Sequence, residues 1–190
     1  MPVATVENRD ALLDVTIGRV KMTQRDAYRI AATFLGLKEI VGPRDEAKIV
    51  QMFADVGHAW VKDDETAWCA AFVGAMIERA GLPSTKALNA RSYLDWGEEV
   101  DPQYAQVGDV VVFSRGDPKG WQGHVAFFVS QDATNISVLG GNQSNMVSVA
   151  RYPKSRLLGV RRITPPAPAP KPVSPFLAWL IRFLGGRSNV

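Results

Sequence analysis

Residues 66–80 read TAWCAAFVGAMIERA, and this stretch decides the fold that we predict. Apolar residues occur on nearly every side of a helix with this sequence, which is typical of a helix buried in a protein core. Acidic and hydroxyl side chains at 63–66 precede it as capping groups, and Gly81 and Pro83 follow it. We therefore predict a buried helix over 66–80.

The spacing of apolar residues differs between the sequence before this helix and the sequence after it. Upstream, residues 24–37 and 45–57 have the spacing of helices. Downstream, five short runs are rich in β-branched and aromatic residues and are separated by Gly, Pro, Asp and Asn. These runs occupy residues 109–114, 124–130, 136–141, 146–152 and 157–163. Helices followed by strands predict an α+β protein, with N-terminal helices packed on an antiparallel meander of about five strands.

The composition divides the 190 residues into four segments. We assign no role to an N-terminal arm at 1–23, predict one folded domain at 24–163, and predict a proline-rich linker at 164–175. Residues 176–190 form a basic amphipathic tail. Eight Lys or Arg and no acidic residue follow position 150, so a basic end adjoins a mildly acidic body. The tail either contacts an anionic membrane or lipopolysaccharide, or folds back on the domain's own apolar surface.

Composition also limits the function classes. A single cysteine excludes an internal disulfide, and with only two histidines we expect no zinc centre and no cofactor. We find no nucleic-acid-binding motif, and no apolar run of the roughly 18 residues that a membrane-spanning helix needs. The N-terminus lacks the pattern of a signal peptide, so we expect synthesis in the cytoplasm.

Cys69 is the candidate nucleophile. It is the fifth or the third residue of the predicted helix, depending on whether Asp64 or Thr66 caps it. The positive end of a helix favours a thiolate, so we expect this position to lower the pKa of the thiol.

His124 and Asn142 are the candidate base and the residue that orients it. Both are equidistant from Ala133, the centre of the turn QDATN, so a symmetric hairpin places them opposite each other. Cross-strand Cβ atoms in such pairs lie about 4.5–5.5 Å apart. The carboxamide then fixes the imidazole tautomer and leaves the second ring nitrogen to the thiol.

Several alternatives stay open at this stage. His58 is a competing base, although it has no evident partner. Trp68, Trp121 and Gln143 are candidate substrate-binding residues. Cys69 and His124 can also be ordinary buried residues, and Asn142 an ordinary turn residue.

Four stretches together resemble the CHAP domain, the cysteine- and histidine-dependent amidohydrolases and peptidases related to the papain-like NlpC group. They are DETAWCAAFVGAMIERAG at 64–81, GDVVVFSRG at 108–116, GHVAFFV at 123–129 and VLGGNQ at 138–143. The resemblance implies a papain-like fold over about residues 24–163. It also implies Cys69 as nucleophile, His124 as base and Asn142 as the orienting residue. Many CHAP domains carry a glutamate two positions before that asparagine, where this chain has Gly140, so Asn142 or its neighbour Gln143 would hold the third role alone.

The resemblance further implies a monomeric peptidoglycan hydrolase of the phage endolysin kind, released from the cytoplasm to act in the periplasm or cell wall. A secreted antibacterial effector with the same chemistry, or a wall-binding module without catalysis, are the alternatives.

Overall fold

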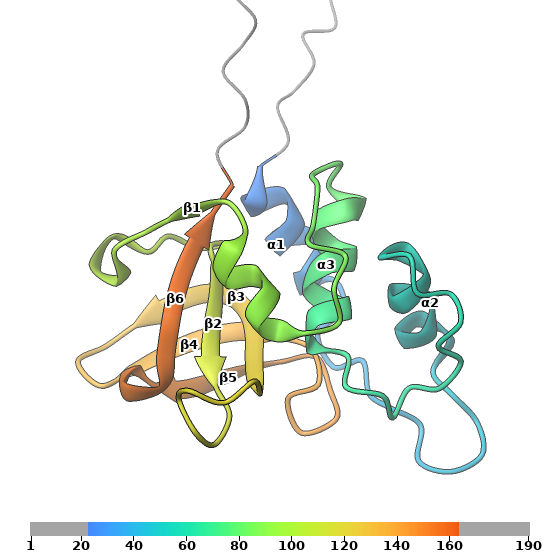
Figure 1. Ribbon diagram of the computed structural model, residues 1–190. Coiled ribbons are helices and arrows are strands. Elements are labelled where there is room, and N and C mark those ends of the chain that lie inside the picture. The colour runs from blue at the N-terminus through green and yellow to red at the C-terminus, as the bar shows by residue number, and fades with distance from the viewer. Residues whose placement is uncertain (1–22, 164–190) are drawn as a thin grey trace, which may run out of the picture.

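The computed structural model describes residues 23–163, an α+β domain whose helices lie to one side of a single antiparallel sheet (Figure 1). Residues 1–22 of the N-terminal arm, the proline-rich linker and the basic tail lie outside the described residues. The α-helices are α1 (Gln24–Ala32), α2 (Ala47–Asp55) and α3 (Cys69–Arg79), and the 3-10 helices are η2 (Ala90–Asp95), η3 (Pro102–Tyr104) and η4 (Lys154–Arg156). The strands are β1 (Glu98–Glu99), β2 (Val110–Ser114), β3 (Gly123–Gln131), β4 (Asn135–Gly140), β5 (Ser148–Pro153) and β6 (Leu157–Arg162).

The sheet has the order β1-β6-β2-β3-β4-β5. The predicted α+β class and papain-like order, with the cysteine helix first and the histidine strand after it, are confirmed, and each of the five predicted runs contains a strand. The sixth strand, β1, is a pair of exposed glutamates beside β6. Two exposed residues carry no periodicity, which explains why the sequence pattern did not reveal this strand.

Helix α3 is the central buried element, as predicted. Its residues from 69 to 77 are all buried. It begins three residues later than predicted, with Trp68 as N-cap and no side-chain cap. The acidic residues before it stabilise loops instead: Asp63 accepts from the N–H of Thr66 at 2.7 Å, and Asp64 accepts from the N–H of Ile40 at 2.9 Å. As a result, Cys69 is the first residue of the helix rather than its third or fifth.

Both faces of the sheet are buried. One face packs Val112, Val125 and Phe127 against the three helices. The other face carries Phe113, Phe128, Ile136 and their neighbours in a second apolar cluster. Tyr152 on β5 stacks on Phe113 of β2 with ring centroids 4.8 Å apart, although two strands separate β2 from β5. The sheet is therefore strongly curved and closes over its own second core.

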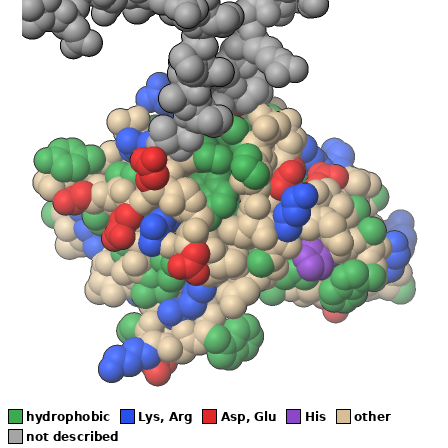
Figure 2. Space-filling model, turned by 45° about the horizontal axis from the view of Figure 1, so that its top comes forward, with side chains coloured by type: hydrophobic (Ala, Val, Ile, Leu, Met, Phe, Trp, Pro, Cys, Tyr) green, Lys and Arg blue, Asp and Glu red, His purple; other side chains and the backbone are tan. Residues whose placement is uncertain are grey.

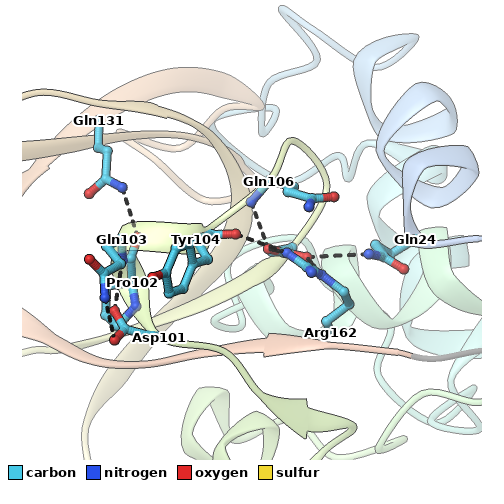
Figure 3. A network of polar contacts seen from close by, with 9 residues as sticks. Gln24, Asp101, Pro102, Gln103, Tyr104, Gln106, Gln131 and Arg162 are labelled. Atoms are coloured by element: carbon cyan, nitrogen blue, oxygen red, sulfur yellow. Dashed lines mark hydrogen bonds and ion pairs between the residues drawn. The ribbon is translucent and has the colours of Figure 1, made fainter.

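A buried ion pair joins the ends of the described chain (Figure 3). Asp109 is fully buried and accepts from Nε and Nη2 of Arg162 at 2.8 and 2.7 Å. It also accepts from Gln24 at 3.3 Å and from the N–H of Gln106 at 2.7 Å. Asp109 thus connects α1, β2 and β6, and the pair raises the pKa of Arg162, mainly through the hydrogen bond to the carboxylate.

The surface shows no single-sign charge patch on the face drawn in Figure 2, where acidic and basic side chains are interspersed. Within residues 23–163, no helix has the length and apolar character needed to cross a bilayer.

Candidate active site

Cys69 stands where α3 meets the sheet. It is the first helical residue, and its exposed fraction is only 6%. It nevertheless lines a surface cleft rather than the sealed core. The other residues lining this cleft are Ala67, Leu88, Asn89, Ala90, Arg115, Trp121, Gln122 and Gly123. The sole thiol of the chain is therefore reachable from solvent through this cleft.

The environment of the thiol differs from the one that its helix position predicts. Burial raises the pKa of Cys69 above its usual value. The backbone N–H of Val125 and the charge of Arg115 act in the opposite direction but do not reverse the shift. The expectation of a lowered pKa was wrong because removal of the thiolate from water outweighs the field of the helix end. Gly123, the residue directly before His124, lines the same cleft as Cys69.

His124 is the second residue of β3 and is completely buried. Its ring stacks on Tyr152, with centroids 5.0 Å apart and an interplanar angle of 21°. Burial lowers the pKa of His124 to about 4, and the nearby Arg115 adds to this effect. The imidazole is therefore neutral near pH 7, as a general base must be.

Gln143 holds the imidazole. Its Oε1 lies 3.2 Å from Nε2 of His124, while its Nε2 donates to the carbonyls of Ser148 at 2.5 Å and Gly140 at 3.2 Å. Because two carbonyls take the amide donors, the amide oxygen must face the ring. Nε2 of His124 must then carry the proton and donate it. The other ring nitrogen, Nδ1, has no hydrogen-bond partner among the described residues, so its lone pair is free to accept a proton.

Asn142, our first choice for this role, is not a hydrogen-bond partner of His124. The predicted register holds in the middle of the hairpin, where Phe127 pairs with Leu139 and Phe128 with Val138. However, β4 ends at Gly140, and Asn142 adopts a left-handed conformation with φ of 54°. Its side chain lines a different surface pocket, together with Glu39 and Glu65. The register was extrapolated past the end of the strand, and the turn gives the position beside the ring to Gln143.

Gly140 makes room for this arrangement. A Cβ atom at position 140 would lie 2.9 Å from Cβ of Ala126 and 3.2 Å from Cδ and Oε1 of Gln143. A side chain at 140 would therefore displace the amide that contacts His124. The glycine that departs from the usual CHAP pattern and the glutamine three residues later are two parts of one arrangement.

The structure separates the other candidates. Trp68 is fully buried and donates from Nε1 to Glu39 at 2.6 Å, so it is a core residue rather than part of the cleft surface. Trp121 lines the cleft and is 74% exposed. Gln143 contacts the base instead of the cleft. His58 lies 2.7 Å from the carbonyl of Lys86 through Nε2 and is absent from the cleft lining.

Sequence reasoning missed three residues. Tyr152 covers the imidazole, Arg115 lines the cleft, and Arg91 donates to the carbonyls of Gln122 and Pro118 in the loop beside the cleft at 2.9 and 3.0 Å. Arg115 directly follows the strand that precedes the histidine strand, but nothing in the sequence separates it from an ordinary surface arginine. Within residues 23–163, no group of three or more His, Cys, Asp or Glu side chains is placed to hold a metal ion.

Comparison with known proteins found a family model that matches part of the chain. Residues 61–142 match the family model described as the CHAP domain, which supports a CHAP-type domain in this part of the chain. The match includes Cys69 and His124 and ends immediately before Gln143. It supports a cysteine- and histidine-dependent amidase or peptidase related to peptidoglycan.

Among solved structures, an NlpC/P60 family protein from Bacillus cereus ATCC 10987 is similar, with 21% identity and a TM-score of 0.47. The similarity covers 75% of this chain and 40% of that protein. No curated protein matches the sequence.

Proposed function

We propose that this CHAP-type chain hydrolyses an amide bond in the peptide part of bacterial peptidoglycan, in the manner of a phage endolysin. The observation that carries the proposal is the geometry around His124. Gln143 fixes its tautomer, Nδ1 is left without a partner, and Cys69 lines the same cleft as Gly123, the residue directly before His124. A binding module without catalysis has no need of a buried histidine held in one tautomer.

In this mechanism both reacting groups are neutral before the substrate binds, because burial raises the pKa of the thiol and lowers that of the imidazole. Cys69 attacks the amide carbonyl carbon while its proton passes to Nδ1 of His124. The imidazolium then gives that proton to the leaving amine, and the acyl group remains on sulfur as a thioester. His124 next takes a proton from water, whose oxygen attacks the thioester and releases the acid and the thiol.

The developing oxyanion needs hydrogen-bond donors. Cys69 is the first residue of α3, so its backbone N–H has no acceptor within the helix. This N–H is a donor for the tetrahedral intermediate, and a fixed donor of this kind contributes about 3–4 kcal/mol to the stabilisation of a transition state.

Purified cell wall tests the proposal directly. Wild type should release soluble peptide fragments, and Cys69→Ser should release none while it still binds the wall. Masses of the products identify the bond that is cut. A thiol alkylator should abolish cleavage and a chelator should not. Wall binding without release of any fragment by wild type would instead indicate a binding module.

A further inference from the structure

Arg115 is an arginine at the cleft whose role the catalytic residues do not explain. It follows β2 directly and lines the cleft together with Cys69 and Trp121. Its side chain is exposed, and its guanidinium makes no hydrogen bond or ion pair with any of residues 23–163. The acidic residue of the same loop, Asp117, accepts from the N–H of Lys119 at 2.9 Å.

The loop that carries Arg115 is held in place. Arg91 on η2 donates to three of its carbonyls, those of Gln122, Pro118 and Asp117, at 2.9, 3.0 and 3.4 Å. The stem of Arg91 also packs against Gly123, where an added Cβ would lie 3.2 Å from Cγ of Arg91. A loop fixed in this way loses little conformational freedom when a ligand binds to it, so its exposed groups are suited to recognition.

The charge of Arg115 acts on both reacting groups. It lowers the pKa of Cys69, which favours the thiolate, and also the pKa of His124, which disfavours the imidazolium needed to protonate the leaving amine. An anion bound to Arg115 would weaken both effects, and weakening the second favours the imidazolium that protonates the leaving amine. Its guanidinium is suited to a carboxylate because it offers paired N–H donors in one plane.

We propose that Arg115 is a specificity-determining residue that binds a free carboxylate of the wall peptide beside the scissile amide. The exposed ring of Trp121, on the same loop, packs against the adjoining apolar part of that peptide. This inference rests on the proposed function, since it names the chemical class of substrate for the same site.

The test uses the full chain and a synthetic stem peptide of the wall, in its free-acid form and in forms amidated at one carboxyl at a time. For wild type, one particular amidation should lower kcat/KM by about 10- to 100-fold, the range expected for a lost hydrogen bond to a charged group. For Arg115→Gln, kcat/KM on the free-acid peptide should fall to the value that wild type has on that amidated peptide. On the amidated peptide itself, Arg115→Gln and wild type should have the same kcat/KM. Lys119→Gln removes a charge from the same loop outside the cleft and should keep the wild-type preference.

Two outcomes would overturn the role of Arg115: equal cleavage of all the peptides by wild type, or equal losses on acid and amide in Arg115→Gln. If wild type cleaves none of them, the proposed function fails. The affinity of the same peptides for Cys69→Ala then tests whether Arg115 binds a carboxylate, independently of any cleavage. A preference for the free acid that Arg115→Gln abolishes supports the carboxylate site, and equal binding of all forms refutes it.

Discussion

The substitution Gln143→Met tests which residue orients His124, the proposed general base. Methionine has a similar length and shape but removes the amide that contacts His124 at 3.2 Å. The net value of one such hydrogen bond is about 1 kcal/mol, and 1.36 kcal/mol corresponds to a factor of ten in rate. We therefore expect kcat to fall about fivefold with little change in KM, because the amide does not line the cleft.

The same substitution should also lower stability. The carbonyl of Ser148, which accepts from Gln143 at 2.5 Å, would lose its donor. A buried polar group left without a partner costs about 1–3 kcal/mol, so the free energy of unfolding should fall by that amount. Urea titration separates this effect from catalysis, since kcat is measured under conditions where the variant is folded.

The matched control is Asn142→Gly. Glycine adopts the φ of 54° at this position readily, so the turn is kept while the asparagine side chain is removed. Wall cleavage and the alkylation rate of Cys69, the chain's only thiol, should both stay close to wild type. Nitrogen-15 NMR should show the Nε2–H tautomer of His124 in wild type and a mixture of tautomers in Gln143→Met. Wild-type activity in Gln143→Met together with lost activity in Asn142→Gly would refute the assignment.

Three further predictions concern stability and the tail. The pKa of His124 is about 4 in the folded protein and about 6.5 when the residue is unperturbed, so between these pH values the unfolded chain binds a proton that the folded protein does not. The contribution of neutral His124 to the free energy of unfolding is therefore complete above about pH 6.5 and is lost as the pH falls to about 4. The loss should reach about 3 kcal/mol, and urea titrations of wild type and His124→Gln across this window should show a smaller pH dependence in the variant. Asp109→Asn should lower the free energy of unfolding, measured in urea, by about 2–3 kcal/mol, because the partly exposed Arg162 loses its buried carboxylate partner. The alkylation rate of Cys69 should not change in this variant. Truncation after Ile163 should preserve cleavage of purified wall and weaken killing of intact cells, and equal killing by the two forms would exclude a membrane role for the tail.

Much of the fold could be predicted because burial leaves a periodic trace in the sequence. Residues 69–77 are apolar on all sides, and they are buried on all sides. The pairing of Phe127 with Leu139 also followed from the sequence, because the hairpin is nearly symmetric about its turn. The extrapolation failed at Asn142, where the strand has already ended and the backbone turns into the left-handed region. The sequence pattern predicts which residues pair within a strand, but it does not predict the backbone conformation of the turn that follows the strand.

The chemical environment was less accessible to sequence reasoning. The position of Cys69 at a helix start was recognisable, and it suggested an acidic thiol. Desolvation depends on what the fold packs around the sulfur, and it is the main cause of the raised pKa of this thiol. Arg115 was missed for a related reason: one exposed arginine in a glycine-rich loop is indistinguishable in sequence from a residue that only increases solubility.

Gly140 and Gln143 show how a departure from a family pattern can be compensated within the same turn. A glutamate at 140 would need the volume that the Gln143 amide now occupies, since even a Cβ there lies 3.2 Å from that amide. Gly140→Glu alone should therefore disrupt the contact with His124 rather than strengthen it. A Cβ at 140 also lies 2.9 Å from Cβ of Ala126, so both neighbours must be reduced. Gly140→Glu combined with Gln143→Ala and Ala126→Gly frees the volume and offers the ring a carboxylate, so this combined variant should be more active than Gly140→Glu alone. If both variants lose the same activity, steric competition between the two positions is not what links them.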